Sequence, residues 1–103
     1  MDSKISFTGD FSRVNEEERE FLNKDLEKFT ERHEQDFNEM HLKIDCKMHK
    51  ETSRGRPSYF IKLTLVSDRG RFHSENQDFG AEKTLVGALR KLDVQIDKHR
   101  QPK

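Results

Sequence analysis

The residues best suited to chemistry in this sequence are basic ones near its C-terminal end, where a helix is expected over 81–100. At about 3.6 residues per turn, four apolar residues project within about 60° of one another and form a core stripe: Leu85, Leu89, Leu92 and Ile96. Four basic residues gather on the opposite side, in an arc of about 80°: Lys83, Arg90, Lys91 and Lys98. Such a row of cations can neutralise nucleic-acid phosphates, although surface lysines also serve simply to keep a protein soluble.

Gly87 and Val94 lie between these basic residues. Glycine costs about 1 kcal/mol of helix propensity relative to alanine, so its presence on a solvated surface needs a reason. One reason is that a missing side chain would let a phosphate backbone approach closely. His99 and Arg100 extend the positive end of the helix.

Other candidate sites are weaker. The run Arg54-Gly55-Arg56-Pro57 matches the core of minor-groove DNA-binding hooks, but a single copy between two strands is more often a basic loop. The five histidines lack the spacing to Cys or carboxylates that a metal site needs. There is no nucleophile in a recognisable catalytic setting and no glycine-rich phosphate loop. We therefore expect no enzymatic activity, no metal, no cofactor and no small-molecule substrate.

Hydrophobic periodicity predicts the elements that position these residues. Alternation predicts strands at 5–9, 40–49, 58–66 and 71–75, the first short and with one buried face. A period near 3.6 predicts helices from 16 to about 33 and over 81–100. Asn15 is the expected N-cap of the first helix, with Glu18 placed as in a reciprocal capping box. A tight turn at 67–70 predicts a hairpin, and 76–80 is expected to be a connection.

This order, β-α-β-β-β-α, predicts an α+β fold in which one four-stranded sheet carries both helices on one face. The whole chain, 1–103, is expected to be a single domain. The other sheet face is left open, and its predicted basic residues are Lys43, Lys47, Lys62 and Arg71, with His41 and His73 beside them. We expect this open face and the helix to form two halves of one larger binding surface.

The charge pattern points to a polyanionic partner. Hydrophobic residues make up 30% of the chain and charged residues 39%, with a net charge of zero. Residues 16–39 hold ten acids and four bases, a net of −6, whereas residues 40–73 hold eight bases and three acids, a net of +5. The single cysteine, Cys46, excludes an intramolecular disulfide and is expected in the core. Without a signal pattern or an apolar membrane span, a cytoplasmic location away from membranes is expected.

Three stretches of the sequence resemble the ribosome hibernation-promoting factors, also called ribosome-associated inhibitors. The run from Arg90 to Arg100 is similar to the final helix of that family, with its Lys-Leu-x-x-Gln-hydrophobic-x-Lys-His-basic pattern. Glu75-Asn76-Gln77-Asp78-Phe79 resembles the acidic turn before that helix. Glu18 to Phe29 resembles the first helix. The order and spacing of these motifs, rather than any single one, carry the resemblance.

The resemblance implies a non-enzymatic factor that binds ribosomal RNA in the decoding channel of the small ribosomal subunit. There it would block mRNA and tRNA sites and silence ribosomes under stress or in stationary phase. It assigns RNA contact to Lys91, Gln95, Lys98, His99 and Arg100. The chain ends at Lys103, as in short family members, and is expected to be monomeric when free.

Two positions depart from the family pattern. Val94 stands where the family often carries a base, and the stretch Gly80 to Thr84 is two residues longer than in short members, which leaves the start of the helix open. Two other functions also stay open. One is a general double-stranded RNA-binding module, although such a module places its basic residues mainly at the start of the last helix. The other is a protein-interaction adaptor that uses the acidic first helix.

Overall fold

The computed structural model describes residues 2–50 and 57–100, with the side chains of residues 2, 50 and 100 left out. The elements follow one another as β1 (Asp2–Gly9), the short 3-10 helix η1 (Asp10–Arg13), α1 (Glu16–Arg32), β2 (Glu39–Lys50), β3 (Pro57–Ser67), β4 (Gly70–Phe79) and α2 (Ala81–Arg100). The predicted order is confirmed, apart from η1, which periodicity could not reveal. The loop with the Arg-Gly-Arg sequence, residues 54–56, lies outside the described residues.

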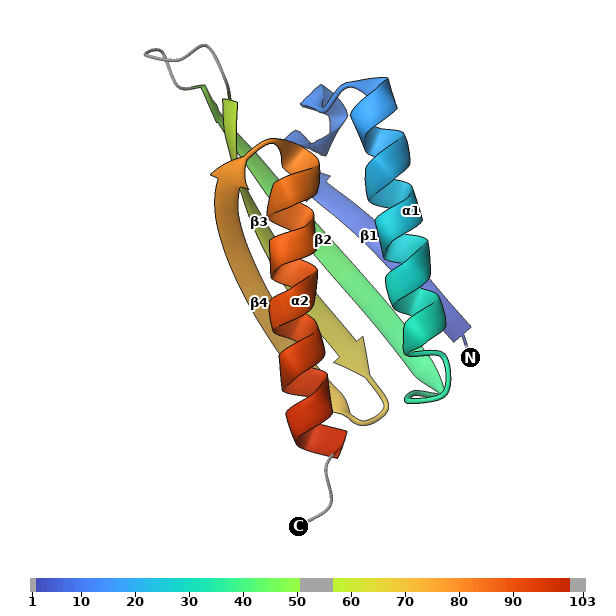
Figure 1. Ribbon diagram of the computed structural model, residues 1–103. Helices are drawn as coiled ribbons and strands as arrows, with labels where there is room; N and C mark the ends of the chain where they lie inside the picture. Colours follow the sequence, from blue (N-terminus) through green and yellow to red (C-terminus); the bar gives the residue numbers. More distant parts are fainter. Residues whose placement is uncertain (1, 51–56, 101–103) are drawn as a thin grey trace.

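The four strands form one sheet in the order β1-β2-β3-β4. β1 runs parallel to β2 because α1 crosses over between them, whereas β2, β3 and β4 form an antiparallel meander. Both helices lie side by side on the same face of this sheet (Figure 1). The α+β fold predicted from the sequence is therefore confirmed.

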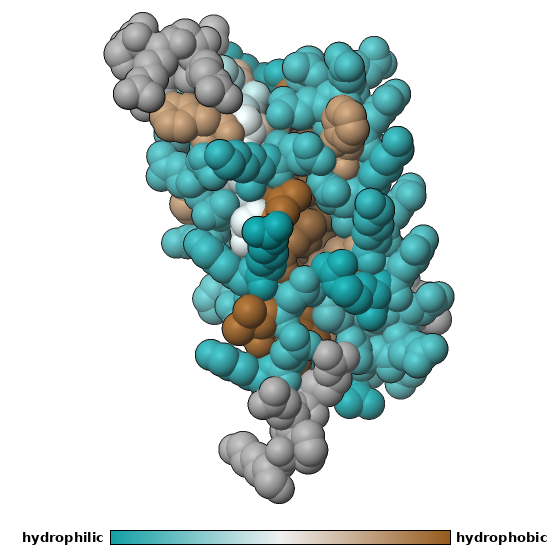
Figure 2. All heavy atoms as spheres, in the orientation of Figure 1, coloured by the Kyte–Doolittle hydropathy of each residue, from teal (hydrophilic) through white to brown (hydrophobic). Residues whose placement is uncertain are grey.

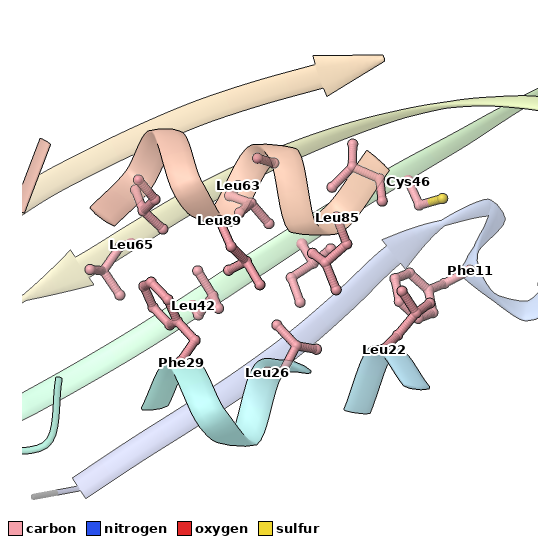
Figure 3. Packing of buried hydrophobic residues seen from close by; sticks show 14 of the residues in the cluster. Phe11, Leu22, Leu26, Phe29, Leu42, Cys46, Leu63, Leu65, Leu85 and Leu89 are labelled. Carbon is pink, nitrogen blue, oxygen red and sulfur yellow. The ribbon is translucent and has the colours of Figure 1, made fainter. Parts of the chain in front are cut away.

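The core lies between this sheet and the helix pair. Leu22, Leu26 and Phe29 of α1 are buried, as is the stripe of α2 from Leu85 to Ile96. They meet the alternate apolar residues of β2 and β3 (Figure 3), which include Leu42, Cys46, Leu63 and Leu65. The helical and strand periodicities read from the sequence thus converge on one apolar layer.

The expectation of a buried face on β1 is wrong. Ile5 and Phe7 lie in register with Leu42 and Ile44 of β2 and so point toward the helix side, yet they remain 36% and 41% exposed. The reason is the position of β1 at the edge of the sheet, where one flank has no neighbour. The ring of Phe11, 4.4 Å from that of Phe7, provides only partial cover.

The two helix starts are linked. Asn15 caps α1 as predicted, because its Oδ1 accepts a hydrogen bond from the Glu18 backbone N–H at 2.8 Å. The predicted return bond of the capping box, between the Glu18 side chain and the Asn15 backbone, is not formed. The Oε2 of Glu18 instead accepts from the backbone N–H of Ala81 at 3.1 Å, and from that of Glu82 at 3.4 Å. One carboxylate thus serves the unpaired amides at the start of α2, which begins at Ala81.

β4 is longer than periodicity indicates. The predicted hairpin turn is present, with Gly70 at a φ of 131°, but pairing with β3 continues to Phe79. The segment 76–79 is therefore strand rather than connection. Its polar character reflects partners on α2, such as the Thr84 carbonyl that accepts from Asn76, rather than a loop.

Candidate nucleic-acid interface

The outer side of α2 carries exposed basic side chains, as the helical wheel predicts. Lys83, Arg90, Lys91 and Lys98 are all exposed. Hydrophilic side chains cover most of the helix side of the molecule, with an apolar strip between the two helices (Figure 2). Val94 lies within this row of basic residues and is 53% exposed. It interrupts the positive charge at a position where another basic side chain would have fitted.

Lys91 lies on the flank of α2 that faces β4. Its Nζ donates to the backbone carbonyl of Glu75 at 2.9 Å and to Oδ1 of Asn76 at 3.3 Å. The side chain remains exposed, so the ammonium group can still face a phosphate while it holds the helix to the strand. Lys91 therefore has a structural role that the sequence did not reveal.

Gln95 follows Lys91 one turn later on the same flank. Its side-chain amide accepts from the backbone N–H of His73 at 3.2 Å and donates to the carbonyl of the same residue. β4 is an edge strand, and Gln95 thereby pairs backbone groups that would otherwise face the unprotected edge. An RNA contact through this amide would have to replace these two hydrogen bonds.

Gly87 has a structural reason that differs from close phosphate approach. A Cβ at position 87 would lie 2.2 Å from Nδ2 of Asn76, which donates to the backbone carbonyl of Thr84 at 3.2 Å. The glycine makes room for the side chain of a neighbouring strand. The expectation that Gly87 admits a phosphate backbone is therefore corrected.

The opposite flank of α2 is bound to the end of α1. Oδ1 of Asp93 lies 2.6 Å from Nε2 of His33, and its Oδ2 accepts from Arg32 at 2.8 Å. The other ring nitrogen of His33 lies 2.7 Å from Oδ2 of Asp36. His33 is only 3% exposed, and each of its ring nitrogens has a carboxylate oxygen within hydrogen-bond distance. This network turns the Asp93 carboxylate toward α1.

His99 and Arg100 end the helix. The ring of His99 packs edge-on against Phe72 of β4, with centroids 5.4 Å apart, and the side chain stays exposed. Arg100 is the last helical residue, and its side chain lies outside the described residues. His99 thus has an apolar support that fixes its position beside Lys98.

The open face of the sheet carries the basic residues expected there. The strand register places Lys43, Lys47, Lys62 and Arg71 on the side away from the helices, and all four are exposed. Lys62 lies between two acids in the register, Asp45 on β2 and Glu75 on β4, which reduces its effective charge.

The helix and sheet surfaces do not form one continuous face. Since both helices cover one side of the sheet, the outer side of α2 and the open face point in opposite directions (Figure 1). The expectation of a single larger binding surface is corrected: they are two separate basic surfaces with the β4 edge between them.

Carboxylates gather where α1 meets the start of α2. The pKa of Glu82 is raised by partial loss of solvent, and then by the hydrogen bond and charge of Asp25 and the charge of Glu18. This end of the helix is therefore acidic, although a helix N-terminus ordinarily attracts anions. The basic character of α2 belongs to its outer side and its C-terminal half.

Within the described residues, no group of three or more His, Cys, Asp or Glu side chains could hold a metal ion. Cys46 is buried in the core, and this burial, together with the charge of Asp10, raises its pKa to about 11. None of the helices in the same ranges is long and apolar enough to cross a membrane.

The fold is shared with solved structures, including the following two. A ribosomal subunit interface protein from Coxiella burnetii matches with a TM-score of 0.66 and 17% sequence identity, over 94% of this chain and 97% of that chain. The N-terminal domain of Protein Y from Thermus thermophilus matches with a TM-score of 0.57 and 13% identity, over 97% and 100% of the two chains. The comparison with curated proteins finds no match.

The family comparison goes further than the fold. The family model described as hibernation factor Hib, C-terminal domain, matches residues 5–103. It thus includes both helices, all of β2, β3 and β4, and every basic residue placed on the two surfaces above. The resemblance to hibernation factors read from the sequence is confirmed, and the chain belongs to the hibernation factor Hib C-terminal domain family.

Proposed function

We propose that this domain binds ribosomal RNA of the small ribosomal subunit near the decoding channel and holds the ribosome inactive without catalysing a reaction. The Hib family match and the likeness to a ribosomal subunit interface protein support a ribosomal partner. The observation that carries the RNA contact is the exposed basic row on the outer side and C-terminal half of α2.

The packing of α2 favours this use of the helix. Asp93 is an acidic residue between the basic residues of α2 in the sequence. Its carboxylate is hydrogen-bonded to His33 and Arg32 on the α1 side, and so it is turned away from Lys91 and Lys98. The opposite flank is held to β4 through Lys91 and Gln95. The basic side chains are thus presented on a helix that is fixed along both flanks, which lowers the entropy lost on binding.

Sedimentation of lysates from starved cells tests the ribosomal partner directly. The protein should migrate with ribosomal particles in a sucrose gradient, and raising the salt concentration should release it because phosphate contacts depend steeply on salt. If the protein stays at the top of the gradient at low salt, the proposal is wrong.

The runner-up, a general double-stranded RNA-binding module, is less well supported. Such a module would use the start of the last helix, where anions ordinarily bind. Here the Glu18 carboxylate already occupies the amides of Ala81 and Glu82, with Asp25 close by. That end of α2 would repel a phosphate, so we place the RNA contact at the other end.

A further inference from the structure

The open face of the sheet has a hollow at the end where β1 and β2 begin and β3 ends. Its volume is about 590 Å³. Lys4, Glu39, His41 and Val66 of the open face line it, together with Ser3, Met40, Ser67 and Asp68. Half of its lining residues point to the side of the sheet away from the helices, and none of them belongs to α2. The family resemblance assigned no residue of this hollow.

The groups in the hollow match the parts of a nucleotide. The Lys4 ammonium is an exposed cation that can bind a phosphate. The half-buried His41 ring, held by a 2.7 Å hydrogen bond to the Ser6 hydroxyl, and the Val66 side chain offer flat and apolar surface to a base. The carboxylates of Glu39 and Asp68 can accept hydrogen bonds from ribose hydroxyls or base amino groups, although Oδ1 of Asp68 already accepts from the backbone N–H groups of Asn38 and Glu39.

A second contact for a base lies further along the same face. Phe60 is a half-buried aromatic residue of β3 that the register places between Lys47 of β2 and Gln77 of β4. Phe79 lies diagonally across from it on β4 and is 38% exposed. Val66 lies six positions after Phe60 on β3, a distance of about 20 Å along the strand.

The charge of this face suits a polyanion. Among the described side chains, this face and the hollow carry five basic residues (Lys4, Lys43, Lys47, Lys62 and Arg71) and four acidic ones (Glu39, Asp45, Asp68 and Glu75), which leaves a net charge of +1. Asp45 already accepts a hydrogen bond from the Thr8 hydroxyl at 2.9 Å. Lys4 at the hollow, Lys43 further along and Lys47 beside Phe60 are exposed on the two neighbouring strands β1 and β2.

We propose that the open face of the sheet binds an unpaired RNA strand, with one nucleotide in the hollow beside Lys4 and a base stacked on Phe60. An unpaired strand is required because a double helix hides the faces of its bases, which aromatic side chains on a sheet stack against in single-stranded RNA. This inference rests on the proposed function, which names RNA as the partner. It adds a second RNA contact on the side of the protein opposite to α2.

Titration of the full chain with a fluorescent eight-nucleotide oligouridylate tests the inference. Phe60→Ala should weaken binding about tenfold, because the stacking of one base is removed. Lys4→Glu should weaken it as well. Phe21→Ala is the matched control, since Phe21 is an exposed phenylalanine on α1, 49% exposed, and its removal should leave binding unchanged.

Nuclear magnetic resonance locates the oligonucleotide independently of the variants. Amide signals near His41, Val66 and Phe60 should shift, and a duplex of the same length should not move them. Shifts confined to α2, or equal binding by the wild type and Phe60→Ala, would overturn the inference. Should Phe60→Ala fail to fold, Phe60→Leu keeps the apolar volume and removes the aromatic ring, with the same expected weakening.

Ribosome sedimentation separates this inference from the proposed function. If the wild type sediments with ribosomes but does not bind the oligonucleotide, the sheet inference fails and the proposed function stands. If the oligonucleotide binds in the predicted place while the protein does not sediment with ribosomes, the sheet inference stands and the proposed function fails.

Discussion

Gly87 of α2 lies so close to Asn76 of β4 that a Cβ at position 87 would be 2.2 Å from the amide nitrogen of the asparagine. Helix propensity alone would make Gly87→Ala stabilising by about 1 kcal/mol. Because the added methyl group must displace a hydrogen-bonded side chain, we predict instead a decrease of about 1–3 kcal/mol in the free energy of unfolding. Chemical denaturation measures this difference.

A double-mutant cycle isolates the cause. In an Asn76→Ala background the obstructing amide is gone, so Gly87→Ala should there be neutral or stabilising. Val94→Ala, on the exposed side of the same helix, is the control and should change stability little. A stabilising Gly87→Ala in the wild-type background would contradict the account of this glycine.

The link between His33 and Asp93 should contribute to stability. Asp93→Ala removes the acceptor for a buried histidine and for Arg32, so we predict a decrease of about 1–3 kcal/mol in the free energy of unfolding. Lys98→Ala, an exposed change on the same helix, should cost much less. Equal effects of the two substitutions would show that the Asp93 carboxylate does not hold the helices together.

Glu82 should make the protein less stable at neutral pH than in mild acid. Loss of solvent and the neighbouring Asp25 raise its pKa in the folded state, so the folded protein holds this proton more tightly than the unfolded chain does. Its contribution is therefore fully present below the unfolded pKa and is lost as the pH rises through the folded pKa.

Replacement of Glu82 by glutamine tests this dependence. We predict that Glu82→Gln raises the melting temperature at pH 7 and has a smaller effect in acid, whereas Glu27→Gln, an exposed change on α1, has little effect at either pH. Melting curves across the pH range measure both. If the Glu82→Gln protein melts at a lower temperature than the wild type at pH 7, the ionised Glu82 carboxylate does not destabilise the fold.

Cys46 should be unreactive in the folded protein. Burial raises the pKa of its thiol to about 11, and the thiolate is the reactive form. Alkylation by iodoacetamide at pH 8 should therefore be slow in buffer and fast in guanidinium chloride. Rapid labelling of the native protein would mean that the strand containing Cys46 opens readily.

Hydrophobic periodicity predicted the fold well, because the apolar residues that form the core recur with the helix and strand periods along the sequence. The stripe from Leu85 to Ile96 and the alternation from Met40 to Met48 both appear where periodicity placed them. The edge position of β1 depends on the topology of the whole sheet, and alternation alone could not show that Ile5 and Phe7 stay exposed.

The candidate site was predicted less completely, because its internal partners are distant in sequence. Glu18 caps a helix that starts 63 residues later, and His33 meets Asp93 across 60 residues. Helical wheels identified Lys91 and Gln95 as polar residues off the core stripe, but only the three-dimensional structure shows that both bind the edge of β4.

Binding of the purified chain to purified small ribosomal subunits over a series of salt concentrations tests the central proposal most directly. The pair of substitutions Arg90→Glu and Lys98→Glu should weaken binding strongly and lower the slope of log affinity against log salt by about one for each phosphate that the protein no longer neutralises. Lys24→Glu, an exposed charge reversal on α1, should leave both unchanged. Equal affinity and slope for the wild type and the Arg90→Glu, Lys98→Glu protein would contradict an RNA contact through α2.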